Sequence, residues 1–177
     1  MLTEEQEKWI NHLSDTDQIK IVSFDPRSQE EFEQVRSLIQ SKFGSSVRVE
    51  HRGASSLGIS GQNEIDIYVP APADSFEDLV IKLTELFGEP RSHYPLERAR
   101  FAVSGIGKKR IDVHLMNEEH SGWLNCKRFE AYLRAHPKAL EEYRLLKESG
   151  DGLSTREYYR KKLEFINESL EKNKIHL

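Results

Sequence analysis

Two carboxylates stand two residues apart in an apolar run. Glu64 and Asp66 alternate with isoleucine in the stretch Glu-Ile-Asp-Ile-Tyr-Val, residues 64–69. Because alternate residues of a strand share a face, we expect both carboxylates to point one way and both isoleucines the other. Two like charges on one face of a strand are unfavourable without a partner, and a divalent cation is a natural partner for carboxylate oxygens. The stretch therefore predicts a cation site on a strand.

A loop of small residues precedes this strand. Three glycines and three serines fall between His51 and Asn63, so the backbone there can bend sharply and approach a ligand closely. Backbone N–H groups and hydroxyls in the loop are candidates to bind the phosphates of a nucleotide. The candidate phosphate-binding residues are Gly53, Ala54, Ser55 and Ser56.

A third carboxylate, Asp112, lies in a second apolar run at residues 110–115. If that strand lies beside the first, about 5 Å away, the three acids converge on one surface. A nucleotidyl- or phosphoryl-transfer site typically has three acids that hold one or two Mg²⁺ ions. These acids face a loop whose backbone N–H groups bind phosphate. The prediction is Mg²⁺-dependent transfer of a nucleoside monophosphate from an NTP to an unknown hydroxyl or phosphate acceptor. Glu64, Asp66 and Asp112 are the catalytic and metal-binding candidates, and the candidates to support them are His51, Lys109, Arg110, His114 and Arg134.

Each of these residues also has a simpler interpretation. The acids of residues 64–66 could lie on the solvated face of an edge strand, and Asp112 could form a salt bridge with Arg110 or Arg100. His51 could only brace the loop. The alternative functions are a non-catalytic nucleotide-binding or regulatory module, and an interaction protein whose helical tail binds a partner.

The surrounding pattern predicts the elements that position these residues. Apolar residues at helical spacing, with Thr3 as a cap at the start of the first helix and a Ser28–Glu31 capping box at the second, predict helices. Alternating runs predict strands, and glycines near residues 105–107 predict a hairpin. The expected helices span residues 3–13, 28–43, 75–87, 123–135, 137–147 and 154–172, and the expected strands span residues 19–24, 47–51, 64–69, 100–104 and 110–115.

This order predicts an α+β fold with a small mixed sheet that has helices on one face, followed by an all-helical C-terminal segment. We expect a core at residues 1–118 and a helical segment at residues 119–177 that packs on it.

Composition restricts the class of protein. The formal net charge of −4 argues against broad nucleic-acid binding. We expect no membrane association, because no apolar run approaches the roughly 18–20 residues that a membrane span needs. A single cysteine, Cys126, and an N-terminus unlike a signal peptide favour a cytoplasmic location.

The chain also resembles a known family. Gly53-Ala54, nine further residues and then Glu64-Ile65-Asp66 resemble the signature of the nucleotidyltransferase superfamily. Within that superfamily the chain is similar to the GrpB family over residues 19–166, which implies a nucleotidyltransferase-like fold and nucleotide-related chemistry. The matching motifs are Phe24-Asp25-Pro26, His51-x-Gly53, Ile65-Asp66-Ile67, Asp112-Val113-His114-Leu115, Tyr132-Leu133-Arg134-Ala135-His136-Pro137 and Tyr143-x-x-Leu146-Lys147.

The chain departs from these patterns at three positions. Ala54 stands where the superfamily usually has serine or glycine, so a hydroxyl contact to phosphate must come from Ser55 or Ser56. Glu64 is an acid where GrpB proteins commonly lack one, and Asp112 replaces their histidine. The chain is thus closer to the three-acid pattern than the family it resembles.

Overall fold

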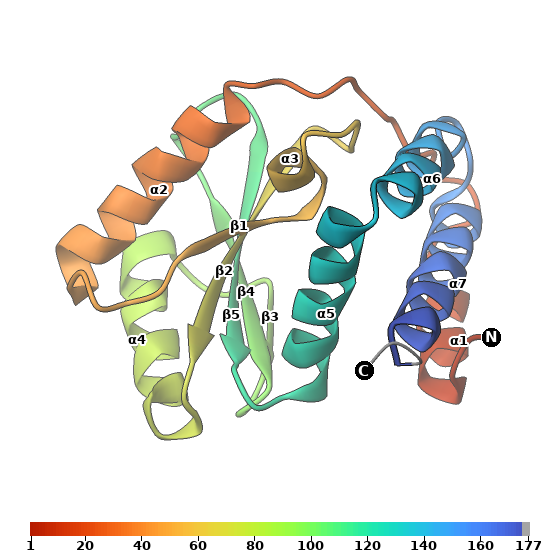
Figure 1. The fold of residues 1–177 in the computed structure, drawn as a ribbon. Coiled ribbons are helices and arrows are strands. Elements are labelled where there is room, and N and C mark those ends of the chain that lie inside the picture. The colour runs from red at the N-terminus through yellow and green to blue at the C-terminus, as the bar shows by residue number, and fades with distance from the viewer. Residues whose placement is uncertain (175–177) are drawn as a thin grey trace. The chain divides into compact units, whose positions relative to one another are not determined.

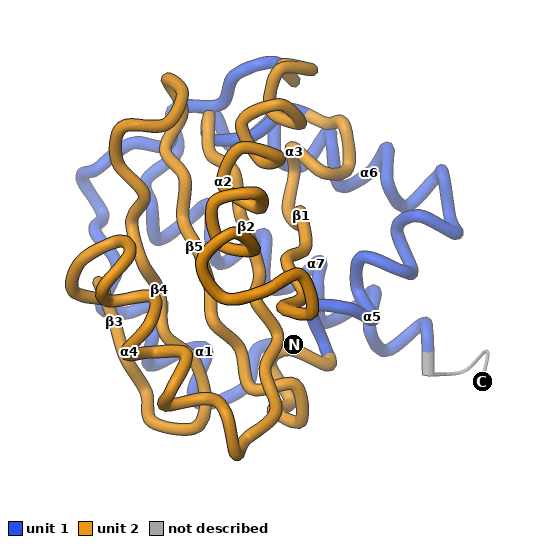
Figure 2. Tube along the Cα trace, turned by 90° about the vertical axis from the view of Figure 1, so that its left-hand side faces the viewer, with its two compact units in different colours: residues 1–23, 60–62, 125–177 blue, residues 24–59, 63–124 orange. Residues whose placement is uncertain are grey.

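The computed structural model describes residues 1–174, which form two compact units. Of the described residues, unit 1 comprises 1–23, 60–62 and those from Asn125 onward, and unit 2 comprises 24–59 and 63–124 (Figure 2). This division differs from the expected boundary at residue 118, because the N-terminal 23 residues group with the C-terminal helices. Residues 175–177 of the expected helical segment lie outside the described residues.

Helices and strands are mixed along the chain up to the end of the last strand, and helices alone follow (Figure 1). The elements are α1 (Glu4–Asn11), α2 (Ser28–Phe43), β1 (Glu50–Arg52), α3 (Gly53–Leu57), β2 (Glu64–Ala71), the 3₁₀ helix η1 (Ala73–Ser75), α4 (Phe76–Phe87), β3 (Ser92–Tyr94), β4 (Arg98–Val103), β5 (Arg110–Asn117), α5 (Ser121–Ala135), α6 (Pro137–Glu148) and α7 (Thr155–Lys174).

Unit 2 is built on one five-stranded sheet, in the order β1-β2-β5-β4-β3. Strands β2 and β5 pair in parallel, and the other three pairs are antiparallel. The connection from β4 to β5 is the hairpin that the glycines predict, with Gly105 and Gly107 at positive φ. The expected mixed sheet of an α+β fold is confirmed.

The sheet of unit 2 has one apolar and one polar face. Ile65 and Ile67 of β2 are fully buried, and they belong to the same core as buried residues of α2 and α4. Figure 1 shows both helices on one side of the sheet. Because side chains alternate along a strand, Glu64 and Asp66 lie on the opposite face. The alternation in the sequence thus determines which face carries the acids.

Unit 1 is helical and includes the part of α5 from Asn125 onward. Thr3 caps α1 in a capping box with Gln6, as expected for the N-cap. Ile10 of α1 is fully buried, and Trp9 packs edge to face with Tyr159 of α7, with ring centroids 5.4 Å apart. The three helices predicted after residue 121 are confirmed as α5, α6 and α7.

Several local predictions were wrong. Residues 19–24 form no strand, because this segment makes only isolated bridges, from Gln18 to Ser154 and from Val22 to Gly61. β1 begins at Glu50 rather than at residue 47. Residues 92–94, for which no strand was expected, form the edge strand β3.

The expected capping box at Ser28 is also wrong. Ser28 is the first residue of α2 and is buried, and its hydroxyl donates to the Asp25 carbonyl oxygen over 2.7 Å. The Asp25 carboxylate instead accepts from the backbone N–H of Arg27 at 3.0 Å. The Asp-Pro turn, rather than the serine, therefore starts this helix.

Among residues 1–174, no helix combines the length and the apolar character that crossing a bilayer requires.

Candidate functional site

The three predicted carboxylates lie together in unit 2. Strands β2 and β5 run in parallel with Asp66 directly opposite Asp112 and Glu64 opposite Arg110. All three acids therefore lie on the polar face of the sheet, on two adjacent strands. Asp112 is 4% exposed, so its side chain is almost entirely removed from water. The structure brings together the acids that the sequence only placed on separate strands.

Two basic side chains contact this acidic group. Arg110 forms ion pairs with Glu64 and with Asp112, with 3.2 Å from Arg110 Nε to Asp112 Oδ2. His114 Nε2 lies 3.4 Å from Asp66 Oδ1. The guanidinium of Arg110 thus offsets part of the mutual repulsion of the carboxylates. The salt bridge between Asp112 and Arg110, one of the two interpretations left open by the sequence, is present.

Gly53 lies directly against the Asp66 carboxylate. Its φ is +76°, and a Cβ added there would stand 2.5 Å from Asp66 Oδ2. Neither the backbone conformation nor the space admits a larger residue without strain. The loop therefore approaches the acidic group closely at this glycine.

The remaining loop residues form a short helical turn rather than an open loop. Residues 53–57 are α3, which ends at Gly58 in the left-handed conformation. The Ser55 hydroxyl lies 2.9 Å from His51 Nε2, and the Ser56 hydroxyl donates to the Gly53 carbonyl oxygen over 3.0 Å. The Ser55 hydroxyl thus has a partner on β1 and the Ser56 hydroxyl has one within the turn, so each would have to rotate to contact a phosphate. Ala54, which lies between Gly53 and Ser55 in the chain, is half-buried.

Two other basic candidates lie outside the acidic group. Lys109 Nζ contacts Asp25 Oδ2 at 2.6 Å, and its side chain is 9% exposed. Its ammonium group therefore joins the end of the β4–β5 hairpin to the turn before α2. Arg134 is exposed near the end of α5, in unit 1.

Two residues of the polar face, Arg52 and Tyr68, were not predicted from the sequence. Arg52 stands opposite Asp66 on β1 and lies over the Trp123 ring, 5.0 Å from its centroid. Tyr68 follows Asp66 by two residues and stacks on His114, with ring centroids 4.7 Å apart. The two-residue alternation from Asp66 could have identified Tyr68, whereas nothing in the sequence indicates the β1–β2 register that places Arg52.

The acidic group has the donor chemistry that Mg²⁺ requires, since this ion prefers carboxylate oxygens. In the described residues 1–174, however, no three side chains of His, Cys, Asp or Glu are arranged to hold a metal ion. Arg110 lies between Glu64 and Asp112 instead. The residues fit the ion in type, and the guanidinium would have to move before they could bind it.

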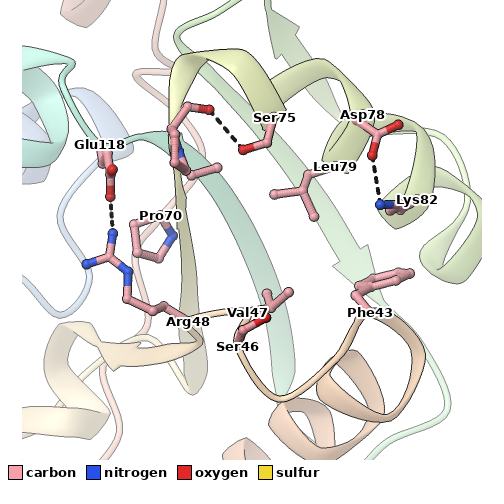
Figure 3. Close-up of a pocket in the computed structure, with 12 residues that line it drawn as sticks. Phe43, Ser46, Val47, Arg48, Pro70, Ser75, Asp78, Leu79, Lys82 and Glu118 are labelled. Carbon is pink, nitrogen blue, oxygen red and sulfur yellow. Dashed lines mark hydrogen bonds and ion pairs between the residues drawn. The ribbon is translucent and has the colours of Figure 1, made fainter.

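A pocket of about 560 Å³ lies at the other end of β2 (Figure 3). Val47, Pro70 and Leu79 supply apolar lining, and the rim carries the ion pairs Arg48–Glu118 and Lys82–Asp78. None of the three candidate carboxylates lines it. The pocket is therefore separate from the acidic group, although both lie along the same strand.

Comparison with known proteins gives one family and one related fold. The family described as GrpB protein matches residues 18–172 of the chain. A crystal structure of conserved protein GrpB from Enterococcus faecalis is similar, with a TM-score of 0.65 and 21% sequence identity over 86% of this chain and 98% of that chain. At this identity the likeness concerns the fold. No curated protein shows significant similarity to the chain.

Proposed function

The chain belongs to the GrpB family, of the nucleotidyltransferase-like superfamily, and on that premise we propose that it is a Mg²⁺-dependent nucleotidyltransferase. It transfers a nucleoside monophosphate from an NTP to a hydroxyl or phosphate acceptor. The observation that carries this proposal is the register of β2 and β5, which sets Asp66 beside Asp112 with Glu64 on the same face. Superfamily members share an acid-apolar-acid strand and a third acid on a later strand.

The loop supports the same proposal. Gly53 lies against Asp66, so a nucleotide that contacts the backbone of α3 also lies near the carboxylates. In this proposal Gly53, Ala54, Ser55 and Ser56 bind phosphate oxygens through N–H and hydroxyl groups. These contacts fix the α-phosphorus relative to the acids, and positioning of this kind supplies much of the rate of phosphoryl transfer.

The chemistry follows from the placement of the acids. An acceptor oxygen forms a bond to the α-phosphorus, the bond to the bridging oxygen breaks, and pyrophosphate leaves. In this proposal Asp112 takes the proton of the attacking hydroxyl. When bound by Glu64, Asp66 and Asp112, Mg²⁺ would neutralise charge that develops on the phosphates. Arg110, which pairs with Glu64 and Asp112 in this structure, would then be free to pair with phosphate.

The Asp66→Asn variant tests the proposal. The amide keeps the size of the side chain but loses the charge, so transfer should fall at least about 100-fold while the circular dichroism spectrum stays unchanged. Transfer is measured as pyrophosphate release from each NTP in the presence of metabolite extract, together with the mass of the nucleotidylated product. The control is Asp74→Asn on η1, an exposed acid in unit 2. An unchanged rate in Asp66→Asn contradicts the proposed role of the acids.

A specific observation favours the alternative of a non-catalytic nucleotide-binding or regulatory module. Arg110 pairs with two of the three acids, and Ala54 stands where the superfamily usually has serine or glycine. Calorimetric titration with each NTP, with and without Mg²⁺, separates the two functions. Tight binding without turnover supports the module, whereas turnover that requires Asp66 supports the transferase.

A further inference from the structure

A chain of hydrogen bonds leads from Ser55 into α2, apart from the acidic group. The Ser55 hydroxyl oxygen lies 2.9 Å from His51 Nε2, and His51 Nδ1 lies 3.1 Å from Gln29 Oε1. Gln29 Nε2 in turn donates to Glu33 Oε1 over 3.1 Å. A hydroxyl, an imidazole, an amide and a carboxylate therefore form one connected series.

The carboxylate at the end of this series determines where the protons lie. Glu33 can only accept when ionised, so the Gln29 amide must present its N–H₂ group to Glu33 and its oxygen to His51. His51 Nδ1 must then carry a proton and donate it to Gln29. In the neutral ring Nε2 is consequently an acceptor, and the Ser55 hydroxyl donates to it.

The imidazole is also held in place by packing. Its ring stacks on Phe32 with centroids 4.8 Å apart and an angle of 14° between the planes. Stacking and the bonds at both nitrogens fix the ring plane and the tautomer together. A serine paired with a histidine that a third group orients is the arrangement of an activated nucleophile.

We propose that Ser55 is a nucleophile towards phosphoryl groups, with His51 as its general base and Gln29 as the residue that positions His51. In the reaction the Ser55 oxygen forms a bond to phosphorus, its proton passes to His51 Nε2, and the leaving group departs with the electrons of its own bond to phosphorus. With an NTP the product is a nucleotidyl-serine and pyrophosphate leaves. The choice of a nucleotide as phosphoryl donor rests on the proposed function, whereas the activation of Ser55 does not.

The neighbouring serine provides an internal comparison. Ser56 donates its hydroxyl proton to the Gly53 carbonyl oxygen, which is too weak a base to remove it. Ser55 should therefore react and Ser56 should not, although the two are adjacent in the same turn.

The test uses the full chain and a fluorophosphonate probe, without nucleotide or metal. Attack by Ser55 releases fluoride and leaves one phosphonyl group on the protein, which intact mass and peptide fragmentation locate. We expect one adduct at Ser55, none in Ser55→Ala, and unchanged labelling in Ser41→Ala, an exposed serine on α2 that bonds the Leu38 carbonyl. No adduct, or an adduct at another serine, overturns the proposal.

Two variants distinguish a base from a structural brace. His51→Gln can still bond Ser55 but is not a base, so labelling should slow at least about 100-fold. The paired change Gln29→Glu with Glu33→Gln keeps the bond between these residues and places a carboxylate against His51. A charged acceptor stabilises the imidazolium, so labelling should quicken roughly tenfold. Equal rates in all folded variants overturn the roles of His51 and Gln29.

A second measurement addresses the donor. The wild type incubated with Mg²⁺ and each NTP should gain the mass of one nucleoside monophosphate at Ser55, and Ser55→Ala should not. A probe adduct without a nucleotidyl adduct, in a protein that still transfers nucleotide to an acceptor, overturns the nucleotide as donor and leaves the proposed function standing. Absence of both the nucleotidyl adduct and any transfer tells against the proposed function itself.

Discussion

Arg110 occupies the position between Glu64 and Asp112 that a divalent cation would take in the proposed reaction. The Arg110 side chain is 60% exposed, whereas that of Asp112 is 6% exposed. The arginine can therefore swing into water, while the aspartate must keep a cation or a hydrogen-bond donor beside it. In the proposed cycle the guanidinium and the metal ion compete for the same carboxylates.

Replacement of Arg110 by glutamine tests this competition. Without the guanidinium the acids repel one another, so the melting temperature of metal-free Arg110→Gln should fall below that of the wild type. Added Mn²⁺ or Mg²⁺ should restore it, and metal affinity measured by calorimetry should rise about tenfold. The control is Arg36→Gln, which removes a half-exposed surface pair with Glu33 on α2. A melting temperature that does not respond to metal contradicts the competition.

Gly53 gives a second prediction at a single position. Gly53→Ala introduces both an unfavourable positive φ and a contact with Asp66, whereas Gly58→Ala introduces only the positive φ, with nothing within 4 Å of the added Cβ. Gly58→Ala should lower the free energy of unfolding by about 1–2 kcal/mol. Gly53→Ala should lower it further and abolish nucleotide binding, because it displaces Asp66. Equal losses in denaturant titrations would show that the contact with Asp66 is unimportant.

The sequence predicts which face of a strand a side chain lies on better than it predicts which residues that side chain contacts. The alternation of acids and isoleucines is enough to place Glu64 and Asp66 on one face, because the strand period depends only on the backbone. The contact of His51 with Ser55 is local, and bracing of the loop by His51 was one of the interpretations left open. The contacts of His51 with Gln29 and of Lys109 with Asp25 could not be predicted, since they join residues far apart in the chain.

At the scale of the elements, Asp25 connects the β4–β5 hairpin to the start of α2. It accepts from the Arg27 backbone and guanidinium and from Lys109. The Arg27 guanidinium first, and then Lys109, hold the pKa of the Asp25 carboxyl well below its usual range. In the folded protein this acid therefore stays ionised at a pH where the unfolded chain would bind a proton.

The sign of this shift predicts a pH dependence. A lowered pKa contributes stability that is complete above the unfolded value of about 3.9 and is lost as the pH falls towards the folded value. The difference in melting temperature between wild type and Asp25→Asn should thus be largest above about pH 5 and shrink in acid. Arg27→Gln should weaken this dependence more than Lys109→Gln does. A difference independent of pH contradicts the assignment.

The errors in predicting elements have physical causes. The segment 19–24 has the apolar residues of a strand, yet it makes only isolated bridges, because its hydrogen-bond partners near Gly61 and Leu153 are irregular backbone. β3 was not predicted, because it has only three residues with a proline directly after them, which is too short a stretch to show the alternation of apolar and polar residues that marks a strand. The bounds of long elements such as α2, α4 and β2 were predicted within a few residues, because many positions in each of them fit the same helical or strand periodicity.

At the scale of the whole chain, three separate stretches form unit 1. Residues 60–62 belong to it, although the chain enters them from α3 and leaves them into β2. There Val22 and Gly61 exchange two backbone hydrogen bonds of 2.8 and 3.0 Å, and Ser60 donates to Glu148 over 2.7 Å. The short connection between the candidate phosphate loop and the acidic strand is thus held by the helical unit. No local pattern could have predicted this grouping, because it depends on contacts between distant stretches.

Packing of α1 within unit 1 gives a prediction for the chain as a whole. Ile10 is fully buried, so Ile10→Ala should lower the free energy of unfolding by about 2–5 kcal/mol. Hydrogen exchange should quicken in α1 and α7 and stay unchanged in β2 and β5. The matched control is Ile81→Ala in α4, where the side chain is 60% exposed and little stability should be lost. Faster exchange in β2 and β5 would show that the two units unfold together.

In the proposed function, Glu64, Asp66 and Asp112 form a metal site for a nucleotide. The most direct measurement is the anomalous difference map of crystals soaked in Mn²⁺ with a non-hydrolysable NTP, since Mn²⁺ takes the same oxygen ligands as Mg²⁺. We predict a peak bounded by the carboxylates of Asp66 and Asp112, with Arg110 moved away from both Glu64 and Asp112. A map with bound nucleotide, no peak at these carboxylates and Arg110 still paired with them would contradict the account.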